Sequence, residues 1–210
     1  MGGAVSTASA AASAAPVVAA VAAGGCGGAA ATAQQVITLA GGCFWCVSAP
    51  YEDLKGVHSS ISGYIGGRTS NPTYKQVCSG DTGHAEAVRV TYDPCQLPLS
   101  SLLDVFFTLH DPTQLNRQGN DFGTQYRSAV FFHTPEQRAA VVEKIAALEA
   151  SGKLGAPVVT QVEDATPHTW YPAEDYHQCY VKNNPTQGYV RAVSIPKYEQ
   201  VRRKFPQLFK

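Results

Sequence analysis

Charge is the first thing that this sequence lacks. The earliest Asp, Glu, Lys or Arg among its 210 residues is Glu52, and 16 basic residues balance 16 acidic ones. A chain with zero formal net charge and no long basic run offers no electrostatic surface for nucleic acid or anionic lipid. We therefore expect a small or neutral binding partner.

Long hydrophobic runs are also missing from the first 35 residues, which are rich in Ala, Gly, Ser and Val. Their longest apolar stretch, "PVVAAVAA" at 16–23, is well short of the roughly 20 residues that a membrane span needs. Residues 1–35 are expected to be a disordered or targeting extension, followed by a single domain over 36–210. "MGGAVS" fits the acylation pattern at Gly2, whereas the segment lacks the arginines of an organelle transit peptide. A soluble, intracellular protein follows, with the cytoplasm favoured and a chloroplast or mitochondrion left open.

Six cysteines are present, irregularly spaced and without the basic start of a secretory signal. This usage is typical of a reducing compartment and not of a disulfide-stapled secreted scaffold. Most of the thiols are expected to be free. Hydrophobic residues make up 44% of the chain, enough for one real core. A monomer is expected.

The stretch "VITLAGGCFWC" contains the first sign of chemistry. "VITLA" predicts a strand and "GG" a turn, after which apolar side chains recur at helical spacing through Phe44, Val47, Tyr51 and Leu54. Cys43 is therefore expected at the start of a helix, and Pro50 predicts a kink or restart in it. The positive end of the helix favours a thiolate at Cys43. The structural alternative is an ordinary core cysteine.

Cys43 and Cys46 form a C-x-x-C pair, which leaves three chemistries open. Zinc would need two further ligands, for which Cys78 and His84 are the nearest candidates. A thioredoxin-like disulfide exchanger is the stronger rival. Two bulky aromatics between the cysteines instead favour an apolar wall for a small hydrophobic group.

"HAEAVRVTYD" predicts a strand that turns Glu86 to the same face as Val88, Val90 and Tyr92. The other face, which carries Ala85, Ala87, Arg89 and Thr91, is expected to be partly solvated. Burial raises the pKa of a carboxyl and favours the proton-donating form, so Glu86 is a candidate general acid. The structural alternative is a Glu paired with His84 or with an arginine.

The remaining pattern alternates helices and strands without a glycine-rich phosphate loop. "HSSISGYIGG", "SAVFF" and "PVVTQVED" predict strands, Pro98 opens an apolar helix, and "PAEDYHQCYVK" predicts a short helix before an irregular tail. The clearest helix starts at Thr134, with Pro135 next, Gln137 completing a capping box and Gly152 at the end. This order predicts a single α+β or α/β domain.

Residues 110–128, "HDPTQLNRQGNDFGTQYRS", show no period of either kind, and a long irregular loop of this sort is functional or disordered. Asp121 and Tyr126 lie in it and Tyr74 lies in another polar segment. Pattern alone would not select these three. Four histidines lack metal-ligand spacing and are interpreted as structural: His110, His133, His168 and His177.

Four blocks together resemble the peptide methionine sulfoxide reductase A family: "GGCFWC", "YKQVCSGDTGHAEAVRVTYDP", "HDPTQLNRQGNDFGTQYRS" and "WYPAEDYHQCY". They occur in the family's order and span about 36–185. The resemblance implies an α+β, mixed-sheet roll with a split β-α-β (ferredoxin-like) core and long irregular loops. It also implies reduction of the S epimer of methionine sulfoxide, free or in proteins, with thioredoxin as electron donor and no metal or organic cofactor.

The same resemblance assigns roles to single residues. Cys43 matches the nucleophile, Phe44 and Trp45 the pocket for the S-methyl group, and Glu86 the acid that protonates the sulfoxide oxygen. The other matching site residues are Tyr74 and Tyr126, which hydrogen-bond that oxygen, and the carboxylate Asp121.

Two departures from the family pattern concern recycling of the enzyme. Cys46 replaces the glycine that many relatives have after "CFW", and no cysteine follows Cys179. Residues three apart on a helix are neighbours, so Cys46 is the first candidate for the resolving thiol and Cys179 the second. A cycle that uses one cysteine and an external thiol stays open.

Overall fold

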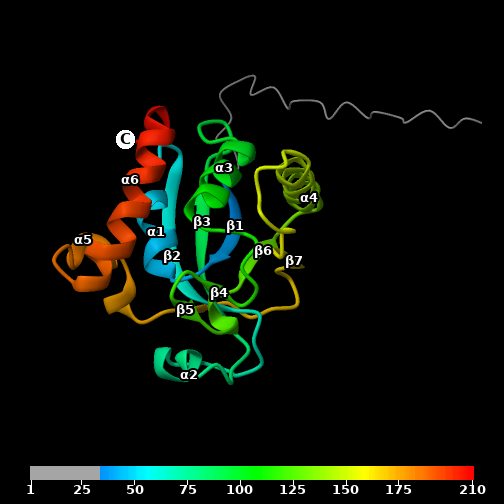
Figure 1. Cartoon of the computed structure of the whole chain (residues 1–210). Helices are drawn as coiled ribbons and strands as arrows, with labels where there is room; N and C mark the ends of the chain where they lie inside the picture. Colours follow the sequence, from blue (N-terminus) through cyan, green and yellow to red (C-terminus); the bar gives the residue numbers. More distant parts are fainter. Residues whose placement is uncertain (1–33) are drawn as a thin grey trace, which may run out of the picture.

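The computed structural model describes residues 34–210, so the predictions for the first 33 residues fall outside it. Its centre is a six-stranded mixed sheet in the order β7-β6-β1-β3-β2-β8 (Figure 1). The strands are β1 (Gln35–Gly41), β2 (Val57–Ile65), β3 (Ala85–Tyr92), β6 (Ser128–Phe132), β7 (Gln161–Asp164) and β8 (Tyr171–Pro172). β6 and β7 pair in parallel and the other pairs are antiparallel.

The predicted split β-α-β core is confirmed. β1 leads through α1 (Phe44–Asp53) to β2, and β3 is inserted between these two strands by antiparallel pairing with both. α3 (Leu99–Leu109) then connects β3 to β6 on the far side of β1. The order β6-β1-β3-β2 with two crossover helices is the ferredoxin-like arrangement of an α+β fold.

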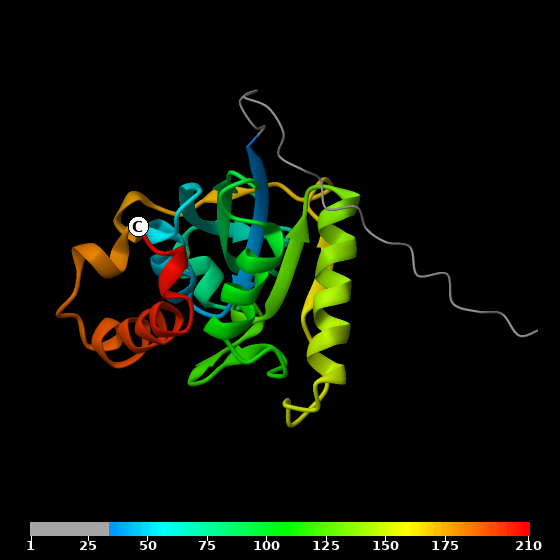
Figure 2. The ribbon, with the colours of Figure 1, turned by 90° about the horizontal axis from the view of Figure 1, so that it is seen from above.

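Helices cover one face of the sheet. α1 and α3 contact the central strands, and α6 (Ile195–Lys204) packs on both of them. α4 (Pro135–Ala150) stands beside β6 and β7, at the edge that Figure 2 shows on the right. The buried residues between these helices and the sheet form the main core, in which Tyr51, Phe106 and Tyr92 are among the largest fully buried side chains.

The opposite face of the sheet carries a smaller buried cluster that includes Ala85, Ala87 and Phe131, with Trp170 packed on it. The expectation that Ala85 and Ala87 would be partly solvated is wrong. The chain between β7 and β8 brings Trp170 onto this face, and Arg89 lies over its indole ring. Sequence alternation alone could not reveal that cover.

The predicted helix ends at residues 134 and 152 are confirmed, with one difference in the capping box. Thr134 accepts the Gln137 N–H, but the Gln137 side chain accepts from the His133 N–H rather than from residue 134. α1 continues through Pro50 to Asp53, so the predicted restart does not occur.

The last third of the chain differs most from the sequence-based expectation. The predicted strand at 157–164 is reduced to β7, and the predicted helix at 172–182 is broken into a 3₁₀ turn, Asp175–His177, and α5 (Tyr180–Asn183). Cys179 interrupts it with a φ of +52°. The expected irregular tail is instead a π-helix, Val190–Ser194, running into α6 and a short 3₁₀ turn, Pro206–Leu208.

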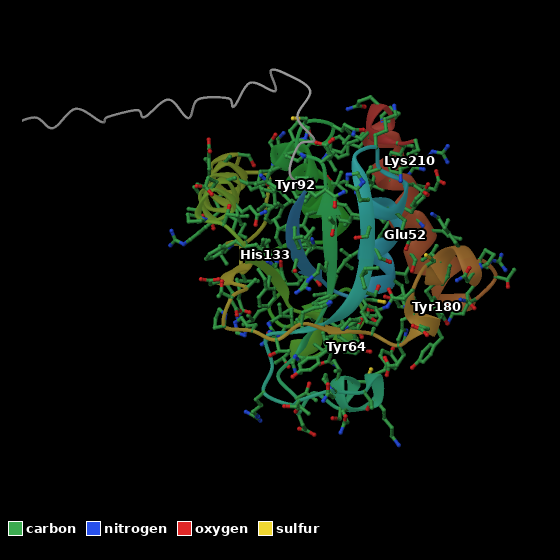
Figure 3. All side chains as sticks on the ribbon, turned by 180° about the vertical axis from the view of Figure 1, so that it is seen from behind. Glu52, Tyr64, Tyr92, His133, Tyr180 and Lys210 are labelled. Carbon is green, nitrogen blue, oxygen red and sulfur yellow. The ribbon has the colours of Figure 1, made fainter. Side chains whose placement is uncertain are left out.

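Two ends of the molecule can be located from the labelled side chains in Figure 3. Tyr64 lies near the end of the sheet that carries α2 (Tyr74–Cys78) and the hairpin of β4 (Arg117–Gln118) and β5 (Asp121–Phe122), and Tyr92 lies near the other end. Glu52 and Lys210 are on one side, where Lys210 Nζ donates to the Glu52 carbonyl at 3.1 Å. The C-terminal residues are thereby held against the end of α1.

Candidate active site

β1 delivers Cys43 to the N-cap of α1. Gly42 between them has a φ of +94°, and a Cβ there would lie 2.7 Å from the Gln118 side chain, so only glycine fits this turn. The Cys43 carbonyl accepts the Cys46 N–H at 3.0 Å, and Cys43 is 8% exposed. The predicted position of this cysteine at a helix start is confirmed.

Glu86 faces the first turn of α1 from the neighbouring strand β3. Its Oε2 accepts the Phe44 N–H at 3.1 Å, which satisfies one of the unpaired donors of the helix start. Glu86 is 1% exposed, and its Oε1 has no hydrogen-bond partner among the described residues. Burial raises the pKa of Glu86 to about 8 despite the Phe44 bond, and the charges of Asp121 and Cys46 act in the same direction. At neutral pH this carboxyl holds a proton that it can donate.

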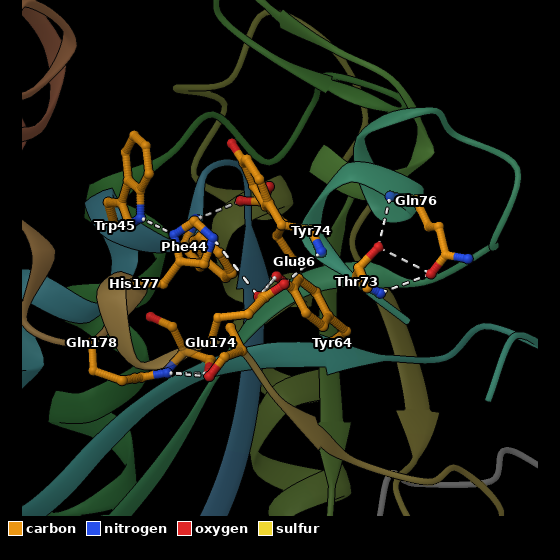
Figure 4. Close-up of polar contacts among 12 residues, drawn as sticks. Phe44, Trp45, Tyr64, Thr73, Tyr74, Gln76, Glu86, Glu174, His177 and Gln178 are labelled. Atoms are coloured by element: carbon orange, nitrogen blue, oxygen red, sulfur yellow. Dashed lines mark hydrogen bonds and ion pairs between the residues drawn. The ribbon is translucent and has the colours of Figure 1, made fainter. Parts of the chain in front are cut away.

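Aromatic rings surround the first turn of α1 (Figure 4). Phe44 is fully buried, with the His177 ring centroid 5.0 Å away and the Tyr74 ring stacked at 6.2 Å. Trp45 stacks on Tyr180 with ring centroids 3.8 Å apart. The apolar wall expected from the sequence is therefore assembled from distant segments.

His177 orients Trp45 within this wall. The Trp45 Nε1–H donates to His177 Nδ1 at 3.0 Å, so the ring proton of the neutral histidine belongs on Nε2. Burial lowers the pKa of His177, which keeps the ring neutral. Its Nε2 has no hydrogen bond among residues 34–210 and lies 3.9 Å from Glu174 Oε2.

Tyr74 and Tyr126 approach from outside the sheet. The Tyr74 N–H donates to Glu174 Oε1 at 2.9 Å, and Glu174 also accepts the Tyr64 hydroxyl at 2.8 Å, which fixes the start of α2 against the sheet (Figure 4). Burial, followed by the charge of Glu86, raises the pKa of both Tyr74 and Tyr126. Both phenols therefore keep their protons and can act as donors.

Asp121 reaches the site from β5, and Tyr189 reaches it from the C-terminal segment. The Tyr189 hydroxyl donates to Asp121 Oδ2 at 2.5 Å and lies 3.8 Å from Cys46 Sγ. Cys46 Sγ also lies 3.2 Å from Ser194 Oγ. The C-terminal segment therefore contacts the second thiol, although its sequence had predicted an irregular tail.

The thiol pair differs from the prediction of a Cys43 thiolate. Burial raises the pKa of Cys43, and its bond to Cys46 and the nearby charges of Cys46 and Glu86 add to that effect. The pKa of Cys46 is lowered to about 6, chiefly by the Cys43 thiol, with smaller contributions from Lys197, Ser194 and, last, Tyr189, while burial acts in the opposite direction. Burial therefore outweighs the helix end at Cys43, and the pair favours a negative charge on Cys46.

All five residues predicted to be catalytic converge on one place. Electrostatic interactions connect Glu86 with Cys43, Asp121 and Tyr74, and connect Tyr126 with Cys43, Glu86 and Asp121. These residues come from β3, the start of α1, α2, β5 and a 3₁₀ turn, Thr124–Tyr126. The long loop at 110–128 supplies two of the five.

Cys179 lies elsewhere. It is exposed beside Glu52, near the other end of α1, and burial and the Glu52 charge raise its pKa. Cys78 lies at the edge of the site, where its thiol interacts with the hydroxyls of Tyr74 and Tyr126. His84 has both ring nitrogens engaged with backbone groups, of Gly67 and Thr69, and is not available as a zinc ligand beside the cysteines.

Sequence reasoning missed part of the site. His177 was interpreted as structural, and no role was given to Glu174, Tyr180, Tyr189 or Ser194. The usable signal was the aromatic-rich block "WYPAEDYHQCY", which contains Glu174, His177 and Tyr180. Tyr189 and Ser194 lie outside this block. Nothing in the polar spacing of residues 189–194 indicated contact with a thiol.

Comparison with known proteins gives the class of this site. The sequence profile of the family described as "Peptide methionine sulfoxide reductase" matches residues 35–208. The peptide methionine sulfoxide reductase MsrA of Deinococcus radiodurans is 54% identical over 173 residues, covering 82% of this chain and 83% of that protein. The protein of the same name from Ralstonia nicotianae is 50% identical over 82% of this chain and 92% of its own length.

Two solved structures are similar to this chain in fold and in sequence. Mxr1 from Saccharomyces cerevisiae in reduced form is 36% identical with a TM-score of 0.65, covering 73% of this chain and 87% of that one. Methionine sulfoxide reductase A of Corynebacterium diphtheriae has the same identity and TM-score and covers 73% and 76%. The protein is thus a thiol-dependent oxidoreductase by class. It belongs to the peptide methionine sulfoxide reductase family, in its A branch.

Within residues 34–210 no helix is long and apolar enough to cross a membrane. The same range contains no group of three or more His, Cys, Asp or Glu side chains arranged to hold a metal ion.

Proposed function

We propose that this protein reduces the S epimer of methionine sulfoxide, free and in proteins, with Cys43 as nucleophile and Glu86 as general acid. The observation that carries the proposal is the contact of the buried Glu86 carboxyl with the first turn of α1, directly beside Cys43. Family membership supports the substrate class.

Cys43 attacks the sulfoxide sulfur while Glu86 protonates the oxygen, because an unprotonated oxygen is a poor leaving group. General acid help of this kind is worth about 10²–10⁴-fold. The bond between Cys43 and the methionine sulfur then breaks together with the S–O bond, the oxygen passes to Cys43 as a sulfenic acid, and methionine leaves reduced by the two electrons that Cys43 has lost. Tyr74 and Tyr126 donate hydrogen bonds to the oxygen, and Phe44 and Trp45 contain the S-methyl group.

The proton of Cys43 has a defined acceptor in this scheme. Cys46, with a pKa of about 6, shares that proton in the resting pair and can take it as Cys43 forms its bond to sulfur. Asp121 holds the Tyr189 hydroxyl at the side of the site where Cys46 lies.

Cys46 is the resolving thiol in the proposed cycle. It condenses with the Cys43 sulfenic acid to a disulfide, and thioredoxin reduces that disulfide. No metal or organic cofactor takes part in the proposed cycle. Cys43, Cys46, Cys78 and Cys179 are free thiols, as this cycle requires, whereas Cys95 is disulfide-bonded. The proposed location is intracellular, where thioredoxin keeps such thiols reduced.

Incubating the full chain with each sulfoxide epimer and dithiothreitol tests the function. Methionine formed from the S epimer alone is the expected result. No methionine from either epimer, together with catalysed disulfide exchange on a test protein, would instead identify a C-x-x-C exchanger. Zinc bound without product would identify a metal or redox-sensing module.

A further inference from the structure

The Cys46 side chain ends against the C-terminal segment and not against the rest of α1. Ser194, which is fully buried, places its hydroxyl oxygen 3.2 Å from Cys46 Sγ, across 148 residues of sequence. Tyr189, five residues before Ser194, lies 3.8 Å from the same sulfur. Two hydroxyl groups from one short segment thus contact the second thiol.

The π-helix explains why both residues reach the same sulfur. In an α-helix, residues five apart differ in direction by about 140°. A π-helix bonds each carbonyl to the fifth following residue, which brings such residues onto one side, and π-turns are frequent at functional sites. Pro196 follows one residue after the π-helix and has no N–H for the carbonyl of Ala192, so an ordinary α-helical register cannot continue through this point.

Only one of the two hydroxyls has its proton free for the sulfur. Tyr189 donates to the Asp121 carboxylate at 2.5 Å, and its proton is therefore committed to Asp121. Ser194 can rotate its O–H toward Cys46. The titratable and charged groups around Cys46 are the Cys43 thiol, the Tyr189 phenol, Glu86 and Lys197, of which Lys197 favours a negative sulfur.

We propose that Ser194 is a positioning residue for Cys46: its hydroxyl donates a hydrogen bond to the sulfur and holds Cys46 as a thiolate ready to attack the Cys43 sulfenic acid. This inference rests on the proposed role of Cys46 as the resolving thiol. In that step Cys46 releases the proton that it took from Cys43, and its thiolate forms the S–S bond. The S–O bond of Cys43 breaks, and the hydroxide that leaves with the electron pair takes up a proton to become water. Cys46 is oxidised and Cys43 is reduced in the exchange.

Ser194→Ala tests the proposal through the pH dependence of disulfide formation. The full-length enzyme is mixed with one equivalent of S-sulfoxide without reductant, quenched at intervals, and analysed by mass spectrometry after a β-diketone has labelled the remaining sulfenic acid. At this step Cys43 is a sulfenic acid, so the Ser194 hydroxyl is a larger part of what keeps the Cys46 pKa low than in the resting pair. Loss of its bond raises the pKa of Cys46, and an increase of about one unit would lower the ionised fraction about tenfold wherever the thiol is mostly protonated. Disulfide formation in Ser194→Ala should therefore slow by up to about tenfold at pH 6, and the slowing should shrink as the pH rises to 8.

Two control variants separate this effect from a general loss of packing. Ser62→Ala removes another buried hydroxyl, one without a hydrogen-bond partner among the described residues, and should leave the profile unchanged. Ser194→Thr keeps the hydroxyl and should restore the wild-type profile. Unchanged rates for Ser194→Ala at pH 6, or equal slowing at pH 6 and pH 8, would overturn the inference.

Failure of the proposed resolving role has a different signature. A Cys46→Ser enzyme that still turns over fully with thioredoxin would remove Cys46 from the cycle, whatever Ser194 does. Release of one methionine per enzyme in the first turnover needs no disulfide, so it tests Cys43 and Glu86 separately from the resolving step. The pH profile of Ser194→Ala, the thioredoxin turnover of Cys46→Ser and the release of methionine in the first turnover therefore test three separate statements.

Discussion

A cysteine and a glutamate lie together near each end of α1, and the two pairs differ in what surrounds them. At the N-terminal end, Cys43 and Glu86 are buried among aromatic rings, and Glu86 Oε1 has no hydrogen-bond partner in the described part of the chain. Near the C-terminal end, about 13 Å along the helix, Cys179 interacts with Glu52. There Lys182 lies 3.4 Å from the Glu52 carboxylate and 2.8 Å from that of Asp53.

The positive charge of Lys182 distinguishes the surroundings of Glu52 from those of Glu86. Burial raises the pKa of both glutamates, but Lys182 opposes the effect at Glu52, while Glu86 has no cation to oppose it. Among residues 34–210, Cys179 also has no second thiol of the kind that Cys46 provides for Cys43. A cysteine beside a glutamate is thus a reaction centre at one end of the helix and part of an ion-pair cluster at the other.

The largest expected effect comes from exchanging the sulfur of each pair for oxygen. Cys43→Ser should abolish methionine formation, because a serine hydroxyl is far too weak a nucleophile at neutral pH. Cys179→Ser should retain full activity with dithiothreitol. The measurement is methionine formed from the S-sulfoxide, and activity in Cys43→Ser would reject this cysteine as the nucleophile.

The glutamates give the next largest difference. Glu86→Gln should slow single-turnover methionine formation by about 10²–10⁴-fold, since it removes the general acid, whereas Glu52→Gln should leave the rate within about twofold. Wild-type Glu86 holds its proton below a pKa of about 8 and loses it above. The wild-type rate should therefore fall as the pH rises through about 8, and this fall should be absent in Glu86→Gln. An unchanged rate in Glu86→Gln would remove the acid from the mechanism.

The second thiol sharpens the contrast between the two ends. Cys46→Ser should still release about one methionine per enzyme but lose about tenfold or more of its turnover with thioredoxin, because no internal disulfide can form. Cys78→Ser, which changes a thiol at the edge of the same site, is the matched control and should keep its turnover. Mass mapping of the disulfide after one turnover should locate it between residues 43 and 46. A different pair would exclude Cys46 as the resolving thiol.

The smallest effect concerns stability at the ion-pair end. Lys182→Met removes two ion pairs of a half-exposed lysine, one with the partly exposed Asp53 and one with the nearly buried Glu52. Because the lysine is solvated, each pair is worth about 1 kcal/mol. The melting temperature should fall by roughly 1–4 °C, and methionine formation should not change. A tenfold loss of activity without a change in melting temperature would contradict the division of roles between the two ends.

Structural features that depend on neighbouring residues in the sequence were predicted well. The strand, turn and helix around Cys43, the burial of Glu86 and both ends of α4 follow from periodicity and capping residues. Each depends on neighbours within a few positions along the chain. The ferredoxin-like order of the sheet came from the family resemblance and not from these patterns.

Features set by distant contacts could not be predicted. The Cys43 pKa is raised because the C-terminal segment, which contributes Tyr189 and Ser194, and the surrounding core bury the helix start. The interruption at Cys179 and the π-helix before Pro196 depend on backbone geometry that composition does not reveal. His177 looked structural because its partner, Trp45, lies 132 residues away.

The separation of 148 residues between Cys46 and Ser194 has a consequence for biosynthesis. At about 5–20 residues per second, a ribosome needs roughly 7–30 s to make the intervening chain. During that time the nascent polypeptide carries both reactive sulfurs before their burying residues exist. Premature oxidation would form a disulfide between residues 43 and 46. The proposed cycle forms the same disulfide, so thioredoxin can reduce it and restore the activity of a newly made molecule.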